Sequence, residues 1–299
     1  MFDVIIAGGS YAGMAAALQL VRARRKVAIV DAGQRRNRFA SASHGLLGQD
    51  GRAPGAIFED AKAQLLKYPD LHWMNGSVVA ASREQGGFAV RTAQGETLAG
   101  KRLVLATGVQ DHLPDVPGLR ERWGRSVHHC PYCHGYELEQ GALGVLAVGE
   151  LSMHQALLLP EWGPTTFFLN GAFEPNPDQL RQLAARGVGI ERTAVAAVSG
   201  EGERACVELA DGRCIALAGL FVGSMISVQG GLAEQLGCAF ADSPLGAVIG
   251  TDAAKETSVP GVFACGDAAR AMASVSFAIA DGAMAGIAAH RSLAFEGLH

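Results

Sequence analysis

The chain has 299 residues, of which 49% are hydrophobic and 18% are charged. This composition is typical of a folded protein with one large domain or two ordinary ones. Its formal net charge of -4 disfavours nucleic acid as a partner. The sequence begins directly with an apolar stretch, and no apolar run reaches the roughly 18 residues that span a membrane. We therefore expect a cytoplasmic protein with neither an export signal nor a membrane partner.

The N-terminal segment predicts a strand, a helix and a second strand. Residues 2–7 form an apolar run, 14–24 form a helical stretch, and 26–30 form another apolar run that ends at Asp31. Continuous apolar runs of this length fit strands buried on both faces of a parallel sheet. The first strand and the helix are joined by a glycine-rich loop made of Gly8, Gly9, Ser10, Tyr11, Ala12 and Gly13.

This βαβ unit carries the fingerprint of a dinucleotide site. In such a unit Gly8 makes the tight turn and Gly13 lets the helix and strand pack closely, while the helix N-terminus faces a pyrophosphate. Asp31 is placed to accept a hydrogen bond from a ribose hydroxyl. Ser10 stands where the fingerprint has its second glycine, but serine is small and can itself bind a phosphate. The alternative is a plain turn without a ligand.

A long loop over 32–51 follows this unit. Loops of this length inside compact domains are usually functional. His44 and residues 49–51 could line a flavin or substrate pocket, or could belong to an ordinary surface loop.

The rest of the chain predicts a second βαβ unit and then a return to the first domain. Turn residues Asp211 and Gly212 indicate a hairpin. The strand before Gly266 and Asp267 is an apolar run like the buried strands of the first domain. The predicted elements are a helix over 54–67, β structure over 71–99, a buried strand ending at Thr107 and Gly108, strands over 143–148 and 165–169 around a helix over 150–162, a strand over 219–224, and a last helix over about 275–293.

Two closely spaced cysteines, Cys130 and Cys133, are followed directly by His134. Such a motif can be a redox pair, half of a zinc site, a c-type haem attachment site or an inert pair. Haem attachment normally needs an exported chain, and structural zinc normally needs a second, separated ligand pair. We expect no metal. His128 and His129 are expected to be structural, and the other four cysteines to be ordinary small core or strand residues: Cys206, Cys214, Cys238 and Cys265.

Four motifs in order resemble the two-domain flavoprotein disulfide reductases: the glycine-rich loop, "ATG" at 106–108, "CPYC" at 130–133 and "GVFACGD" at 261–267. The cysteine pair inside the second domain is similar to that of the low-molecular-weight thioredoxin reductases. The variant "CPYCHGYE" most resembles the thioredoxin-reductase-like dithiol oxidases, which close disulfides of small metabolites such as gliotoxin and holomycin.

The resemblance implies an α/β fold with two Rossmann-like three-layer nucleotide-binding domains, the second inserted into the first. A discontinuous FAD-binding domain would cover 1–114 and 225–299. The inserted domain, similar to an NAD(P)H domain, would cover 115–224 and carry the cysteines. The resemblance also implies FAD as cofactor and a homodimer.

The resemblance further implies roles for single residues. Cys133 would sit against the flavin, Cys130 would exchange with the external thiol or disulfide, and His134 would act as acid and base. A helix start at the cysteines would lower the thiol pKa. The remaining FAD contacts would come from the turn at Thr107 and Gly108, backbone at Val79 toward the adenine, Gly266 and Asp267 at the ribityl chain, and the Ala278 N–H at the flavin pyrimidine carbonyl.

The inserted domain departs from thioredoxin reductase where NADPH should bind. Its loop over 147–152 keeps only the middle glycine and places Glu150 beside the expected pyrophosphate, where like charges repel. After the next strand the chain has Glu174 and Asp178 and no arginine before Arg181, so the 2′-phosphate has no evident partner. We therefore expect no productive NADPH binding.

The sequence thus favours an FAD-dependent dithiol–disulfide oxidoreductase, a thiol oxidase that passes electrons to flavin and then to O₂. One alternative is a disulfide reductase fed by NADPH, ferredoxin or a second flavin. Another is a non-catalytic flavin-binding redox sensor. The substrate would be a small dithiol or disulfide metabolite or a thioredoxin-like protein.

Overall fold

The computed structural model describes residues 1–298 and divides them into two compact units. Unit 1 contains Met1–Arg38, Pro54–Gln110 and residues from 226 onward, and unit 2 contains Phe39–Ala53 and Asp111–Met225. The loop over 39–53, which the predicted boundary placed in the first domain, therefore groups with unit 2. The last residue of that predicted domain, His299, lies outside the described residues.

Unit 1 is built on a seven-stranded sheet in the order β3-β2-β1-β6-β5-β4, with β19 also paired to β6. Parallel pairing joins β3, β2, β1, β6 and β19, whereas β4 and β5 are antiparallel additions. The apolar run of β1 is buried as predicted. The strands are β1 (Phe2–Ala7), β2 (Val27–Asp31), β3 (Leu71–Asn75), β4 (Val78–Glu84), β5 (Gly87–Thr92), β6 (Thr97–Leu105) and β19 (Val262–Ala264).

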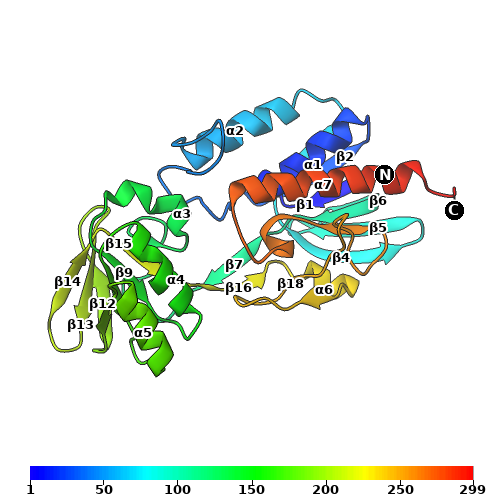
Figure 1. The fold of residues 1–299 in the computed structure, drawn as a ribbon. Helices are drawn as coiled ribbons and strands as arrows, with labels where there is room; N and C mark the ends of the chain where they lie inside the picture. Colours follow the sequence, from blue (N-terminus) through cyan, green and yellow to red (C-terminus); the bar gives the residue numbers. More distant parts are fainter. Residues whose placement is uncertain (299) are drawn as a thin grey trace. The chain divides into compact units, whose positions relative to one another are not determined.

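In unit 1 the last helix, α7 (Val275–Ala294), packs along the first, α1 (Tyr11–Arg22) (Figure 1). Gly282 and Gly286 allow this approach, because an added Cβ would meet the backbone of Ala12 and Ala16. Besides the two ends of the loop over 39–53, the chain passes between the units within β7 (Val109–His112) and β16 (Met225–Val228). The other elements of unit 1 are α2 (Pro54–Leu65), α6 (Leu232–Leu236), β17 (Phe240–Ala241), β18 (Val248–Ile249) and the 3₁₀ turn η3 (Gly266–Ala269).

Unit 2 contains a five-stranded parallel sheet in the order β11-β10-β9-β15-β8. Its fully buried side chains include Phe167, Phe168 and Phe221. The predicted helix over 150–162 is shorter: it gives way to a 3₁₀ turn at Leu159, because Pro160 lacks the N–H that would continue an α-helix. The elements are β8 (Val127–His128), α3 (Pro131–His134), η1 (Tyr136–Leu138), β9 (Leu143–Leu146), α4 (Ser152–Leu158), η2 (Leu159–Glu161), β10 (Thr165–Phe168), α5 (Pro177–Ala185), β11 (Gly189–Glu191) and β15 (Gly219–Val222).

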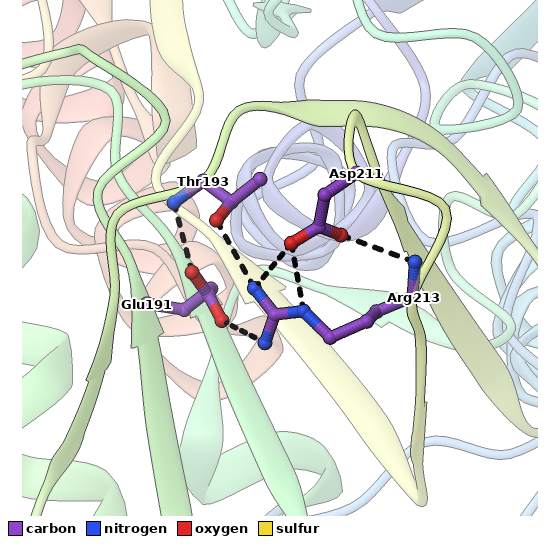
Figure 2. A network of polar contacts seen from close by, with 4 residues as sticks. All are labelled: Glu191, Thr193, Asp211 and Arg213. Atoms are coloured by element: carbon purple, nitrogen blue, oxygen red, sulfur yellow. Dashed lines mark hydrogen bonds and ion pairs between the residues drawn. The ribbon is translucent and has the colours of Figure 1, made fainter.

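A second, antiparallel sheet of unit 2 joins β12 (Val195–Ser199), β13 (Ala205–Leu209) and β14 (Cys214–Leu217). A polar network ties its predicted hairpin turn to the end of β11 (Figure 2). The Arg213 guanidinium donates to Glu191 Oε2 at 2.7 Å, to Thr193 Oγ1 at 3.0 Å and to Asp211 Oδ2 at 2.8 Å. Chiefly through the Arg213 hydrogen bond, the pKa of Glu191 falls to about 2.

Cys206 and Cys214 lie on strands as expected, but they are not ordinary strand residues, because they are bonded to each other. Cys206 on β13 and Cys214 on β14 form a disulfide, with Cα atoms 6.0 Å apart. The hairpin brings the two strands together, which sequence spacing alone did not reveal. Cys238 and Cys265 are buried and free, as predicted. Among residues 1–298, no helix is both long and apolar enough to cross a bilayer.

Candidate active site

The cysteine pair follows the edge strand β8 of unit 2. Cys130 has extended backbone and precedes α3, and Pro131 occupies the first helical position, as predicted. A disulfide joins Cys130 to Cys133, with Cα atoms 5.3 Å apart. An added Cβ at Gly135, after the helix, would meet the ring of Trp162, so the helix lies tightly on that ring. The disulfide therefore lies at the start of a short helix whose C-terminal end packs on Trp162.

His134 ends α3 and stacks on His128, the last residue of β8, with ring centroids 4.4 Å apart. Burial, and then the charge of His44, lower the pKa of His134 from 6.5 to about 4. Burial, and then His134, lower the pKa of His128 to about 3. Both imidazoles are therefore neutral at pH 7, and a neutral His134 can accept a proton from a thiol beside it.

His44 comes to this region on the loop over 39–53. Backbone bonds from Ser43 N to the Arg52 oxygen at 2.8 Å, and from Gly51 N to the Ser43 oxygen at 2.9 Å, close the loop. His44 Nδ1 lies 3.3 Å from Glu137 Oε1 and 3.6 Å from Asp50 Oδ2. Because Glu137 is three residues beyond His134, the loop residue stands beside the cysteine helix. The sequence left its role open.

In unit 1 the glycine-rich loop forms a close cradle. An added Cβ at Gly13 would collide with the carbonyl of Gly8, which explains the predicted close approach of helix and strand. The Gly9 N–H donates to Asp31 Oδ1 at 3.0 Å, fixing the carboxylate predicted to bind a ribose. Ser10 begins α1, but its side chain makes no capping bond to the described helix.

Groups at the end of β6 complete the fit to a bound dinucleotide. The buried hydroxyl of Thr107 has no hydrogen-bond partner among residues 1–298, and a buried orphaned hydroxyl calls for a ligand or water. Tyr11 is buried and its hydroxyl donates to the Pro54 carbonyl at 3.2 Å. Gly108 and Gly266 have positive φ angles of 69° and 68°, which turn the chain after β6 and β19. These residues fit an FAD site.

Of two further predicted FAD contacts, one does not match the backbone as it stands. The N–H of Ala278 donates to the Ser274 carbonyl at 2.9 Å as part of α7, so it is not open to a flavin oxygen. Helix geometry explains this mismatch, because the fourth helical residue is the first to bond back to the residue before the helix. The carbonyl of Val79 accepts from Gln235 Nε2 at 3.3 Å, and the contact of the Val79 backbone with the adenine stays a prediction.

Asp267 does have a partner that sequence reasoning missed. Arg36 Nη1 donates to Asp267 Oδ2 at 2.9 Å. The two residues are 231 positions apart in sequence, and the only available signal was the cluster of arginines in the loop. Arg36 thus adds a cation to the region where FAD is expected.

In the loop of unit 2 that is expected to bind NADPH, backbone N–H groups are hydrogen-bonded within the chain. Where a helix start binds an anion, its first N–H groups point at the ligand. Here, by contrast, four N–H groups of the loop and the first helical turn have partners within the chain. Glu150 lies in this loop and accepts from Gln179 Nε2 at 2.7 Å. The internal bonds run from Val148 N to Ser152 Oγ at 3.0 Å, from Ser152 N to the Gly149 oxygen at 3.1 Å, from Met153 N to the Glu150 oxygen at 3.0 Å, and from His154 N to the Leu151 oxygen at 3.3 Å.

The segment after β10, which was expected to face the 2′-phosphate, likewise carries an internal ion pair. Arg192 follows β11 and could supply the cation that the segment after β10 lacks. Glu174, however, accepts from its Nη2 at 2.7 Å and its Nε at 3.2 Å. The Glu174 hydrogen bond and charge raise the pKa of Arg192. The arginine is therefore already paired with a carboxylate.

Comparison with known proteins gives a consistent result. The model of the pyridine nucleotide-disulphide oxidoreductase family matches residues 2–155 and 173–282. Two relatives are each 32% identical: thioredoxin reductase tcpT of Claviceps purpurea, covering 95% of this chain and 92% of that protein, and thioredoxin reductase sirT of Leptosphaeria maculans, covering 96% and 92%. A crystal structure of an oxidoreductase from Agrobacterium tumefaciens is 55% identical, covers 99% of both chains and has a TM-score of 0.95.

Proposed function

Since the chain belongs to the pyridine nucleotide-disulphide oxidoreductase family, an FAD-binding family of oxidoreductases, we propose that it oxidises small dithiols to disulfides with O₂ as the final acceptor. The observation that carries the proposal is the state of the second nucleotide loop. Its first N–H groups are bonded within the chain, and Glu150 lies among them. A loop whose first helical N–H groups are already bonded, and which carries a carboxylate, disfavours a pyrophosphate.

The cysteine pair supplies the thiol chemistry. A substrate thiolate attacks Cys130 sulfur and breaks the bond to Cys133, which forms a mixed disulfide. The second substrate thiolate then attacks the substrate's own sulfur, which closes the product and leaves both cysteines reduced. The two protons of the dithiol pass to bases of the site, and His134 is the base beside the pair.

Bound FAD supplies a two-electron acceptor that can return the pair to the disulfide. The residues that would hold it are the glycine-rich loop, Asp31, Thr107, Arg36 and Asp267. Over the whole cycle one dithiol and one O₂ give one disulfide and one H₂O₂, so atoms and electrons balance.

An anaerobic titration of the yellow protein tests the proposal. Dithiothreitol should bleach the flavin absorbance, and admitting air should restore it with one H₂O₂ per dithiol oxidised. NADPH at micromolar concentration should leave the colour unchanged. Rapid bleaching by NADPH would overturn the proposal, as would a flavin that neither reductant bleaches.

A variant pair assigns the chemistry to the cysteines. Cys133→Ser should bind FAD but lose bleaching by dithiothreitol, whereas Cys238→Ser, at a buried free cysteine, should behave like the parent protein. Bleaching retained in Cys133→Ser contradicts the assigned role.

A second candidate, reduction of a thioredoxin-like protein, is favoured by the names of the two relatives. It predicts that NADPH, reduced ferredoxin or a reduced flavin bleaches the protein and that the electrons then reduce thioredoxin. The same titration separates the two directions of electron flow.

A further inference from the structure

His134 has two titratable neighbours that act on it, and they differ in their access to water. On one side lies His128, which is 5% exposed and packs on Phe221 with ring centroids 5.5 Å apart. Neither nitrogen of His128 has a hydrogen-bond partner among residues 1–298. A proton passed to His128 would therefore have no onward acceptor.

The second neighbour is His44, whose charge lowers the pKa of His134 and whose Nδ1 lies 3.3 Å from Glu137, three residues beyond His134. Its imidazole is partly covered, with 19% of the side chain exposed, and Nδ1 faces two carboxylates. Those carboxylates open to solvent, because Glu137 is 42% exposed and Asp50 is 67% exposed. The series of titratable groups that leads outward from His134, through His44 to Glu137 and Asp50, therefore ends at groups exposed to water.

We propose that His44, held by Glu137 and Asp50, is a positioning residue that carries protons between His134 and solvent. This inference rests on the proposed function and adds a residue from a segment outside the cysteine motif. Each dithiol that closes releases two protons, and the base beside the cysteines must lose a proton before the next cycle. His44 takes it from His134 and passes it to water along the two carboxylates, so no charge accumulates at the buried end.

Electrostatics support the direction of transfer. Two imidazolium groups close together repel, so His134 and His44 do not hold protons at the same time without a cost. His128 on β8 stacks on the ring of His134, the charge of His44 on the loop acts on it, and Cys133 precedes it directly in the chain. The groups facing His44 are Glu137 and Asp50, and they attract a proton outward.

Stopped-flow reduction by dithiothreitol provides the kinetic test. His44→Asn should slow bleaching at neutral pH by roughly 10- to 100-fold, within the range of general acid–base effects. Added imidazole should restore part of the rate. His154→Asn, which changes an exposed histidine of α4 in the same unit, should have no effect. An unchanged rate in His44→Asn, or a slow rate without imidazole rescue, would overturn the inference.

A second measurement does not involve the flavin. With the pair reduced, the rate of alkylation of Cys130 by iodoacetamide reports the thiolate as a function of pH. Replacing His44 removes the charge that lowers the pKa of His134, so His134 keeps its proton at higher pH, which stabilises the thiolate. The alkylation midpoint of His44→Asn should therefore move to lower pH, and an unmoved midpoint contradicts the coupling.

The two experiments separate failure of the inference from failure of the proposed function. If dithiothreitol does not bleach the parent protein, the oxidase proposal fails while the alkylation profile still decides whether His44 acts on His134. If the parent bleaches normally but His44→Asn matches it in both measurements, the inference alone fails.

Discussion

His134 lies against His128, with ring centroids 4.4 Å apart and ring planes 26° from parallel. The stack places the candidate base on a side chain that is itself buried and without hydrogen-bond partners in the described chain. An apolar ring could fill the same place. His128 therefore serves as a packing surface for His134, and this relationship has a measurable effect on stability.

Replacing His128 by Phe should make the protein less sensitive to acid. Burial lowers the pKa of His128 from 6.5 to about 3, so between these values the unfolded chain binds more protons than the folded one. The free energy of unfolding must then fall as pH falls through this window, by up to about 1.4 kcal/mol per pH unit for this residue. His128→Phe removes that contribution, and urea unfolding at pH 7, 6 and 5 measures the change in slope.

The exposed His154 provides the control for this experiment. His154→Phe, which changes an exposed histidine of the same unit, should keep the pH dependence of the parent. At pH 7, His128→Phe should unfold with a free energy equal to the parent's or about 1 kcal/mol higher, since two buried unpaired nitrogens are lost. If the free energy of unfolding changed with pH equally in His128→Phe and in the parent, protonation of His128 would cost the folded state no stability, which would contradict the prediction.

Replacing Gly13 by Ala should lower the FAD content of the purified protein several-fold. The added Cβ would meet the Gly8 carbonyl, which would push α1 away from the loop that cradles the cofactor. The ratio of flavin to protein absorbance measures the loss. Gly55→Ala in α2 is the matched control, because its nearest atom is the Arg35 side chain at 3.9 Å, and its flavin content should not change. Equal flavin in both variants would contradict the cradle.

The parts of the fold that sequence predicted well are those set by local pattern. β1, α1 and β2 follow from apolar runs and helical spacing, and Asp31 follows from its distance along the unit. The partners Arg36–Asp267 and His44–Glu137 were not predictable, because folding joins segments with no shared local signal. The prediction that the Ala278 N–H binds the flavin was wrong for a different reason. The first residue of α7 decides which N–H groups are free, and the sequence pattern located that residue only approximately.

The Cys206–Cys214 bond should contribute to stability and not to redox turnover. It closes a short loop, for which the chain-entropy relation gives about 2.5 kcal/mol, and it lies on the hairpin of the second sheet of unit 2. The double variant Cys206→Ser, Cys214→Ser should unfold at lower urea concentration while its bleaching by dithiothreitol matches the parent. Slower bleaching in this variant would instead place the second pair on the electron path.

Removing the carboxylates of Glu150 and Glu174 from the region of unit 2 expected to bind NADPH should partly restore NADPH binding. Glu150→Gly removes the charge beside the expected pyrophosphate, and Glu174→Ala releases the Arg192 guanidinium for a phosphate. Together they should lower the dissociation constant of NADPH about tenfold or more, as the change in charge favours the anion. Quenching of protein fluorescence by NADPH measures the constant.

Glu161→Gln is the control for the Glu150 and Glu174 variants, because Glu161 is also paired with an arginine, Arg186, at 2.6 Å. It should leave the dissociation constant unchanged. The internal bonds of the Val148 and Ser152 N–H groups remain in the double variant, so affinity should stay below that of an intact glycine-rich loop. A double variant that binds NADPH no better than Glu161→Gln would show that these occupied donors, and not the two charges, exclude the nucleotide.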